Sequence, residues 1–572
     1  MSEENDLEEG NSPWEHVSQI KFANDEVTNI NRDDIVVFVG PNNVGKSQAL
    51  KDIMNISNKG SNVDDDTIII KEIKIVKNKG DIKEYIKKIS IKDEDFGENA
   101  YRGLDYLIYG HNYSFWDNEE ILGEFTKVFM VYLDTLNRLN ICNPAENIKR
   151  NQARTHPIHY AAYDSERRQW LTENYRTAFG EDLIPNTQYG SLIPLCIGKP
   201  VKLEGTYEDE QVRQEKYAEI LEKYKQVQDQ GDGIKSFTGI LLYLMMDNYC
   251  TYLIDEPEAF LHPPQAKIMG SIIGKKLSTK KQAFIATHSE EIVKGLMESA
   301  PHRIKIIRID RDENNNFISI LNNNDFNKVW SDPLLRYSNI MSSLFHKTVV
   351  LCESDSDCRM YSIVDNYLKR QEGKYSETLF IHCGGKHRMA KIIIALKSLG
   401  VNIRVISDID VLNDEGVIRG IAESVGLEWG ETLKKYYNVL ASNLHSSKEN
   451  INRNEAKTTI NRVLGQSDNQ DLSNSEIKEI RNAIKLESKW KTIKDNGKIA
   501  IPSGEATDAF NKLSDALEDK DIFLVPVGEL EGFVKDVGGH GPEWVNAVLE
   551  RYPELDNPIF DTIKKFVITL NI

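Results

Sequence analysis

Carboxylates follow three apolar segments in the second half of the chain. The segments are 347–352, 403–407 and 521–527, and each is followed within a few residues by acidic side chains. The carboxylates concerned are Glu353, Asp357, Asp408, Asp410, Glu529 and Glu531. Like charges that are crowded together repel and raise one another's pKa, so such a group either splays into water or holds a cation.

The spacing of these acids predicts that they converge. Glu353 and Asp357 are four residues apart and project on one face if a helix begins directly after the strand. Asp408 and Asp410 are two residues apart, which places them on one side of an extended chain. Parallel strands end at one edge of a sheet, where α/β folds build their sites. We therefore expect the six acids to hold Mg²⁺ or Mn²⁺, which prefer oxygen ligands; the alternative is a set of solvated turn acids.

A second pattern lies near the start of the chain. GPNNVGKS at 40–47 follows an apolar segment and precedes a predicted helix, and G-x-x-x-x-G-K-S is typical of a phosphate-binding loop. We expect the Lys46 ammonium to reach the β- and γ-phosphates of ATP and the Ser47 hydroxyl to bind Mg²⁺. The further nucleotide-binding residues predicted from this motif are Gly40, Asn42, Asn43, Gly45 and Gln48. The alternative is an ordinary glycine-rich turn between a strand and a helix.

Two later segments offer the partners that such a loop needs. TYLIDE ends in Asp255, which suits a water-mediated contact to Mg²⁺, and in Glu256, which suits a base that polarises water. IATHS ends another apolar run in His288, placed to sense a γ-phosphate. A lone histidine at a strand end is more often structural, but behind LIDEP a role in the site is favoured.

Apolar runs that alternate with helical patterns predict an α/β fold with parallel sheets, and 572 residues are too many for one ordinary core. We expect domains at 1–340 and 341–572, with helical insertions at about 78–225 and 412–518. Within the first insertion, 118–140 and 208–230 have helical patterns. The predicted strands are 34–40, 250–256, 282–288, 347–352, 378–383, 403–407 and 521–527, with a helix at 386–399.

Composition excludes several classes of protein. Charged residues at 28% and hydrophobic residues at 40% describe a soluble globular chain. The longest apolar run, 239–246, is too short for a membrane span, and the acidic N-terminus is no secretory signal. Six cysteines without CxxC spacing favour reduced thiols in a cytoplasmic protein. The formal net charge of −18 gives no global attraction to nucleic acid, so such binding requires a local basic groove or metal.

GPNNVGKS, LIDEPEAFLHPPQ and FIATHS together resemble an ABC-type ATPase head of the SMC/Rad50 kind. That resemblance implies a signature loop that binds the nucleotide of an opposite subunit. QGDGIKS at 230–236 is the candidate, with Gly231, Gly233 and Lys235 facing the phosphates. A signature that acts in trans implies paired heads, hence at least a homodimer.

The second half resembles a Toprim domain, with a strand–Glu, GGK at 384–386 opening a helix, and a strand–DxD. An ABC-type head followed by Toprim resembles the overcoming-lysogenisation-defect (OLD) family of nucleases. The resemblance implies an ATP-binding, Mg²⁺- or Mn²⁺-dependent DNA endonuclease in which the acids hold two metals. The catalytic residues it implies are Glu256, His288, Glu353, Asp408, Asp410 and Glu531. The family also has a lysine after the last acidic strand, for which Lys535 and His540 remain alternatives here.

Relatives of the family imply partners. Some act in antiphage systems such as Gabija, with a helicase-like protein, and others accompany retron reverse transcriptases. A scaffold that senses a nucleotide or a phage component, with a Toprim domain that acts on RNA or needs a partner, is the alternative from another class. A DNA-repair ATPase of the SMC type is disfavoured because no long coiled-coil heptads interrupt the head.

Overall fold

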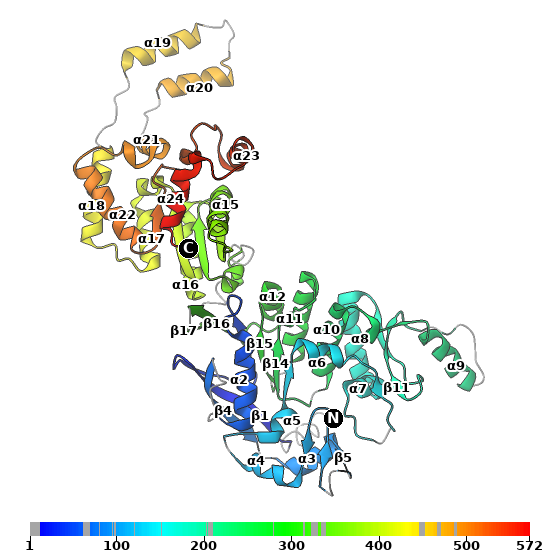
Figure 1. Cartoon of the computed structure of the whole chain (residues 1–572). Helices are drawn as coiled ribbons and strands as arrows, with labels where there is room; N and C mark the ends of the chain where they lie inside the picture. Colours follow the sequence, from blue (N-terminus) through cyan, green and yellow to red (C-terminus); the bar gives the residue numbers. More distant parts are fainter. Residues whose placement is uncertain are drawn as a thin grey trace. The chain divides into compact units, whose positions relative to one another are not determined.

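The chain divides into two compact units, Met1–Pro333 and Leu334–Ile572 (Figure 1). The computed structural model describes residues 12–60, 69–78, 80–93, 95, 99–118, 120–149, 152–201, 203, 210–246, 248–277, 280–312, 315–321, 330–332, 339–445, 452–465, 471–484 and 489–572. Within these residues, no helix is both long and apolar enough to cross a membrane.

A six-stranded sheet with the order β17-β16-β3-β15-β14-β8 forms the centre of the first unit. Its strands are β3 (Ile35–Val39), β8 (Met130–Leu133), β14 (Thr251–Asp255), β15 (Gln282–Ala286), β16 (Ile304–Asp312) and β17 (Asn315–Ile320). All neighbours pair in parallel except β17, which is antiparallel to β16. Every residue of β3 is buried, as expected of a parallel strand covered on both faces.

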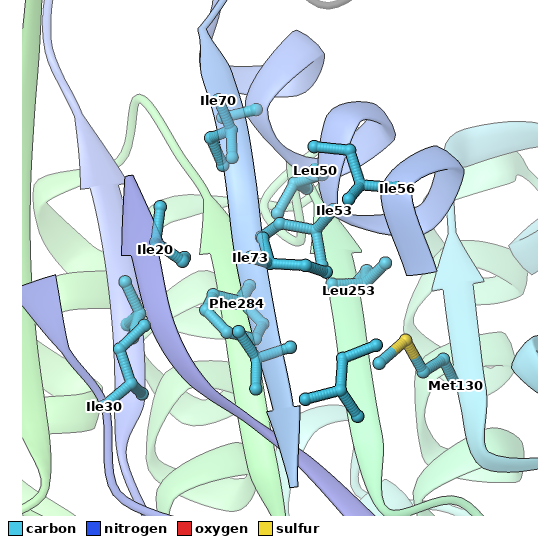
Figure 2. Packing of buried hydrophobic residues seen from close by; sticks show 14 of the residues in the cluster. Ile20, Ile30, Leu50, Ile53, Ile56, Ile70, Ile73, Met130, Leu253 and Phe284 are labelled. Carbon is cyan, nitrogen blue, oxygen red and sulfur yellow. The ribbon is translucent and has the colours of Figure 1, made fainter. Parts of the chain in front are cut away.

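A second sheet shares the core of this unit. Strands β1 (Trp14–Phe22), β2 (Val27–Asn29) and β4 (Ile70–Asn78) form it in the order β2-β1-β4, all antiparallel. Helix α2 (Lys46–Lys59) contributes Leu50, Ile53 and Ile56 to the same cluster. Figure 2 shows these side chains packed with residues of β1, β4, β14 and β15. This core fixes the axis of α2, the helix that follows the glycine-rich loop.

The segment predicted as a helical insertion contains short strands as well. Its elements are α3 (Ile82–Ile89), β5 (Ile91–Lys92), β6 (Tyr101–Arg102), β7 (Leu107–Ile108), η2 (Gly110–Asn112), α4 (Tyr113–Asp117), η3 (Gly123–Phe125), α5 (Thr126–Phe129), α6 (Thr135–Asn140), β9 (Ala145–Glu146), α7 (Pro157–Tyr163), α8 (Ser165–Phe179), β10 (Asp182–Pro185), β11 (Leu192–Ile193), β12 (Leu195–Gly198), α9 (Glu210–Leu221) and β13 (Lys225–Gln226). The helix predicted over 208–230 is therefore shorter, and 204–209 lie outside the described residues.

The helix predicted over 118–140 is wrong. A turn of 3₁₀ helix and the short α5 lead into β8, which pairs in parallel with β14 at the edge of the central sheet. The Asp134 carboxylate then accepts a hydrogen bond from Asn137 N at 2.8 Å and caps α6. The run FMVYL is apolar at helical spacing, but burial in the sheet decides its structure, and the cap starts a separate helix.

The remaining elements of the first unit are helical. They are η4 (Val227–Asp229), α10 (Asp232–Met245), α11 (Pro263–Lys276) and α12 (Glu290–Ser299). Helix α10 is buried along most of its length from Ser236 to Met245. Helices α11 and α12 pack against each other.

The second unit is built on a parallel four-stranded sheet with the order β19-β18-β20-β21. Its strands are β18 (Thr348–Cys352), β19 (Thr378–His382), β20 (Asn402–Ser407) and β21 (Ile522–Leu524), preceded by η5 (Met341–Phe345). The core cluster of this unit joins strand residues to α15 (Asp355–Gln371), α23 (Gly541–Arg551) and α24 (Asp561–Thr569). The α/β fold with parallel sheets is thus confirmed.

Helices dominate the segment between β20 and β21, as predicted for 412–518. They are α17 (Glu415–Val425), α18 (Glu431–His445), α19 (Arg453–Leu464), α20 (Asn474–Ala483), α21 (Lys489–Asn496), η8 (Gly497–Ala500) and α22 (Glu505–Glu518). Between β19 and β20 lie η6 (Lys386–Arg388) and α16 (Met389–Ser398), and η10 (Pro558–Phe560) precedes α24. Helix α21 packs against η7 (Ile409–Asn413), which follows β20 directly.

Candidate functional site

The glycine-rich loop connects β3 to α2, as its sequence predicts. Gly40 has φ +144° and Gly45, which caps α2, has φ +100°. A Cβ added at Gly40 would lie 2.0 Å from the carbonyl oxygen of Ile309. Only glycine fits the Gly40 position, because both the backbone angle and the space exclude a side chain.

Lys46 is held against this loop. Its side chain is buried, and Nζ donates to the carbonyl oxygens of Gly40 at 3.0 Å and Pro41 at 2.6 Å. Burial lowers the pKa of Lys46 to about 8, although Glu256 and its acidic neighbours raise it. An anion placed here would favour the charged ammonium, which is the property a phosphate site needs.

Ser47 and Asp255 meet across the sheet, 208 residues apart in sequence. Ser47 Oγ donates to Asp255 Oδ1 at 2.7 Å, and the hydroxyl of Tyr132 donates to Asp255 Oδ2 at 3.1 Å. The hydroxyl and carboxylate predicted to bind Mg²⁺ are therefore adjacent. Their oxygens suit that ion. Tyr132 was not predicted to take part in the site, because the pattern over 118–140 predicted a helix where the structure has strand β8.

Glu256 and His288 also meet. His288 Nε2 lies 2.9 Å from Glu256 Oε1, and Glu256 has the positive φ of +47°. Arg138, which is fully buried, donates from its guanidinium to the backbone carbonyls of Asp255 and Glu256. Arg138 thus holds the bend after β14. This role was not predicted, because 118–140 was expected to form one helix.

Glu258 orients the segment that carries His288. Its carboxylate accepts hydrogen bonds from His288 N at 2.6 Å and from Thr287 Oγ1 at 2.8 Å. Burial raises the pKa of Glu258, and those hydrogen bonds oppose the rise. Glu258 therefore fixes the backbone of the segment that carries His288. The sequence did not predict a role for Glu258.

The other predicted nucleotide residues take varied positions. Gln48 Nε2 donates to Asp52 Oδ1 at 2.8 Å, so its side chain lies along α2. Asn42 and Asn43 are exposed at the loop tip.

The candidate signature segment lies at the start of α10. Gly231 precedes the helix, and Lys235 forms an ion pair with Asp232 at 3.0 Å. A Cβ on Gly233 would lie 2.7 Å from the carbonyl oxygen of Phe260. Gly233 is therefore packed against the backbone that follows β14 in its own chain.

Three of the predicted metal ligands form one group. Glu353, Asp408 and Asp410 each offer a carboxylate oxygen, and these oxygens lie within 4.8 Å of one another. Glu353 Oε1 accepts hydrogen bonds from Ser407 Oγ at 2.7 Å and from Asp408 N at 3.1 Å. Adjacent strands β18 and β20 thus bring the first and second acidic segments together.

Asp357 lies in the first turn of α15, close enough to Glu353 and Asp408 to repel them. Glu353 lies before α15, whose N-cap is Ser354. Asp357 Oδ2 accepts a hydrogen bond from Ser354 N at 2.8 Å, while Ser354 Oγ accepts one from Asp357 N at 3.3 Å. Asp357 therefore closes a capping box, which stabilises the helix start, and it belongs to neither group of candidate ligands found among the described residues.

Asp408 and Asp410 meet for a different reason from the one expected. Strand β20 ends at Ser407, and Asp408 caps the 3₁₀ turn η7 that contains Asp410. The two acids converge through this turn, since the strand alternation that predicted it has already ended.

A second group follows β21. Glu529, Glu531 and His540 have ligand atoms within 4.8 Å of one another. His540 Nδ1 lies 3.5 Å from Glu531 and 4.0 Å from Glu529, and Gly541 N donates to Glu531 Oε1 at 2.9 Å. The side chain of His540 is 78% exposed, so its position beside the acids depends on few contacts.

Burial and mutual repulsion raise the pKa values of four of these carboxyls. The pKa of Asp408 lies well above its ordinary value, because of burial first and then Glu353 and other nearby acids. Burial also raises the pKa of Glu353 and Glu529, and raises that of Asp357 to about 6. A divalent cation would offset this repulsion, and the oxygen-rich donor set suits Mg²⁺ or Mn²⁺. The residues present therefore fit such an ion.

Two lysines contact these acids. Lys386 Nζ donates to Asp410 Oδ1 at 2.9 Å and to the Asp410 carbonyl oxygen at 3.1 Å. Lys494, on α21, lies 3.6 Å from Asp410 Oδ2 and 3.3 Å from Glu529 Oε2. Lys386 was visible in the GGK motif. No sequence signal marks Lys494, because it stands in the insertion, far along the chain from the acids.

Lys535, one of the two alternatives for the family's lysine, turns away from the acids. Its Nζ donates to the Asp495 carbonyl oxygen at 3.3 Å and to Asn496 Oδ1 at 3.4 Å, at the end of α21.

Two family models match the chain. Residues 200–294 match "AAA domain, putative AbiEii toxin, Type IV TA system". Residues 344–410 match "Overcoming lysogenization defect protein-like, TOPRIM domain". The first range includes Asp255, Glu256 and His288, and the second includes Glu353, Asp408 and Asp410.

A curated relative and two solved structures are similar to parts of the chain. The Old nuclease of Escherichia phage P2 is 23% identical over 167 residues, which are 28% of this chain and 28% of the relative. The SMC head bound to the C-winged helix domain of ScpA is 13% identical with a TM-score of 0.32, over 55% of this chain and 99% of that one. The SMC head domain from Thermotoga maritima is 12% identical with a TM-score of 0.28, over 54% and 99%. The chain thus carries a segment similar to an AAA-type ATPase domain followed by a segment similar to an OLD-like Toprim domain.

Proposed function

We propose that the protein is an ATP-hydrolysing, Mg²⁺- or Mn²⁺-dependent endonuclease that cuts phosphodiester bonds in DNA. The observation that carries this proposal is the convergence of two ligand groups at the ends of three adjacent parallel strands, in the unit that matches a Toprim model. Carboxylates that are buried together with raised pKa values are a costly arrangement unless a cation is bound.

Each ligand group would hold one metal ion. Glu353, Asp408 and Asp410 form the first set, and Glu529, Glu531 and His540 the second. Bound divalent ions supply an activated water and offset charge on the phosphate. The hydrogen bonds that Ser407 Oγ and Asp408 N donate to the Glu353 carboxylate favour its ionised, ligating form and oppose the effect of burial.

The first unit would bind ATP with Mg²⁺ and hydrolyse it. Lys46 would turn from the loop carbonyls to the β- and γ-phosphates, while Ser47 and Asp255 would hold the ion. Glu256 would accept a proton from the attacking water, oriented by its contact with His288. Gly231 and Lys235 would face the nucleotide of a second copy, so the working form is at least a homodimer.

Binding of DNA by a chain of net charge −18 requires a local cationic surface. A pocket with a volume of ≈ 570 Å³ lies between α3, β5 and the segment 152–160. Its charged lining residues are Lys87, Lys88, Lys92 and Arg154. Among the described residues, Lys88 and Lys92 have no carboxylate within ion-pair distance, so both are free to contact phosphates.

The biological role we propose is defence against phage in the cytoplasm. A helicase-like protein or a retron reverse transcriptase with its nucleic acid would be the partner, as in systems that the chain resembles. Phage plating on cells with the wild-type gene, the Asp408→Ala gene and an empty vector tests this role. Equal plating on all three would remove it, while leaving the nuclease chemistry to its own test.

Incubation with supercoiled plasmid tests the chemistry directly. Wild-type protein is incubated with Mg²⁺, Mn²⁺ or EDTA, each with and without ATP, and nicked and linear products are measured. We expect cleavage with either metal and none in EDTA. Parallel incubation with labelled RNA separates the alternative, since cleavage of RNA alone, or of neither substrate, would contradict a DNA endonuclease.

A further inference from the structure

The cation Lys494 joins the two ligand groups, although it comes from neither. Its Nζ lies 3.6 Å from Asp410 in the first group and 3.3 Å from Glu529 in the second. A side chain that touches one residue of each group stands between the two places where metal ions would bind. A cation in that position would suit the phosphate of a bound phosphodiester.

The helix that carries Lys494 is held by its backbone. Trp490 and Ile493 of α21 are buried. Gly528 has φ +106°, and a Cβ there would lie 1.9 Å from the carbonyl oxygen of Lys494 itself. Gly528 thus allows the helix to pack directly on the loop that leads to Glu529, so Lys494 is a placed residue rather than a mobile surface lysine.

The far end of α21 is fixed in the same way. Gly497 has φ +71°, and a Cβ there would lie 2.2 Å from the carbonyl oxygen of Pro526. Lys535 Nζ donates to the Asp495 carbonyl oxygen and to Asn496 Oδ1. The contacts of Lys535 hold the helix that presents Lys494.

The two lysines at the acids differ in how they are engaged. Lys386 donates to both the carboxylate and the carbonyl of Asp410, so it fixes the shape of that turn. Among the residues that the structure describes, the contacts of the Lys494 ammonium are side-chain ion pairs, and Lys494 is 38% exposed, against 20% for Lys386. An ammonium that is held by salt bridges alone can exchange a carboxylate for a phosphate oxygen.

Charge also favours this exchange. The two groups contain five carboxylates, and two lysines contact them. The two groups and the lysines together therefore come near to electrical neutrality only when a further cation binds. If metal ions were bound by Asp410 and Glu529, the Lys494 ammonium would lose these two ion-pair partners.

We propose that Lys494 is a catalytic residue whose ammonium contacts an oxygen of the phosphodiester during cleavage. The proposal deepens the proposed function and rests on it. In hydrolysis the water oxygen bonds to phosphorus, the bond to one ester oxygen breaks, and the water protons end on the products and solvent. Lys494 neither gains nor loses a proton; its charge stabilises the negative charge that grows on the phosphate and the leaving oxygen.

Variants at this position test the proposal in the full-length protein. Lys494→Met removes the charge at similar length, and Lys494→Arg retains it. Lys498→Met is the matched control, because Lys498 is an exposed lysine of the same insertion that has no part in the acid groups. Plasmid cleavage is measured at saturating Mn²⁺, with Mn²⁺ affinity by calorimetry and melting temperature in EDTA and in Mn²⁺.

The proposal predicts that Lys494→Met lowers kcat by about 10²–10³-fold, the usual loss when one donor to a developing oxyanion is removed. KM for DNA should change little. Mn²⁺ affinity should stay the same or rise, because the competing cation is gone. Lys494→Arg should recover part of kcat, and Lys498→Met should match the wild type.

Three results would overturn the proposal. Wild-type kcat in Lys494→Met would make Lys494 only a counter-ion of the metal-free site. Loss of Mn²⁺ binding in Lys494→Met would show that Lys494 has a structural role. So would a lowered melting temperature of that variant that Mn²⁺ does not return to the wild-type value. If the wild-type protein cuts no nucleic acid, the proposed function itself is refuted. If the wild type and Lys494→Met cut equally well, only the role of Lys494 is refuted.

Discussion

The two candidate sites differ in the sign of the charge they lack. In the first unit, burial lowers the pKa of Lys46 to about 8, so the glycine-rich loop favours an anion. In the second unit, burial and neighbouring acids raise the pKa of Asp408 and Glu353, so the strand ends favour a cation. Opposite pKa changes with the same physical cause, desolvation, indicate opposite ligands.

The sites also differ in how their polar groups are paired. In the first unit the predicted residues are already in contact, Ser47 with Asp255 and Glu256 with His288. In the second unit like charges face one another, with Lys386 and Lys494 as partial compensation. We therefore expect a bound ligand to stabilise the second site more than the first.

The largest expected effect is the loss of DNA cleavage in Asp408→Ala. Removal of a ligand should reduce cleavage by more than about 100-fold, which is the upper range for disturbing only the partners of a ligand. ATP hydrolysis should be nearly unchanged, because the two sites lie in different units. Plasmid cleavage and phosphate release measured on the same preparation check both halves. Cleavage at the wild-type rate would end the assignment of these acids.

Glu256→Gln should have the converse effect. The amide cannot accept a proton, so ATP hydrolysis should slow by about 10²–10⁴-fold while ATP binding is retained. Calorimetry with a non-hydrolysable analogue and phosphate release measure the two. Light scattering with ATP should also show a stable dimer of this variant; wild-type turnover would refute the role of Glu256.

The contrast between the sites also predicts how stability depends on pH. The raised pKa of Asp357, about 6, means that the folded state binds the proton more tightly than the unfolded state, whose ordinary value is 3.8. This contribution to the free energy of unfolding is present below about pH 4 and is lost as pH rises through about 6; each pH unit between the two pKa values corresponds to about 1.4 kcal/mol. Melts in EDTA should show the loss, and melts in Mn²⁺ should show less of it. A metal-free protein whose stability rises from about pH 4 to about pH 6.5 would contradict the prediction.

The smallest effect concerns the basic pocket of the first unit. Removal of two phosphate contacts by Lys88→Ala with Lys92→Ala should weaken DNA binding and reduce the slope of log affinity against log salt by about 2. Lys59→Ala with Lys275→Ala is the control, since it removes two exposed lysines outside the pocket. Equal slopes in both double variants would show that the pocket does not bind DNA.

Local sequence patterns predicted most of this arrangement. Continuous apolar runs that end in Asp255, Glu353 and Asp408 predicted the parallel strands and their order along the chain. A parallel strand is buried on both faces, so its sequence is apolar throughout. The partners that come from elsewhere were not visible. The contact of Arg138 with the Asp255 carbonyl was not predicted, because β8 was taken for part of a helix. Lys494 comes from an insertion whose packing depends on Gly528 and Gly497. Sequence patterns report neighbours along the chain, and these contacts are made across it.

The titration of Mn²⁺ into wild-type protein and Asp408→Ala, without nucleotide, tests the central claim most directly. The account predicts that the wild type binds Mn²⁺ at the acids of the second unit, where ligand atoms within each of the two groups lie within 4.8 Å of one another. Asp408→Ala should bind it at least about 10-fold more weakly, as expected for a lost ligand contact. Identical isotherms for the two proteins would contradict the claim that the strand-end carboxylates form a metal site.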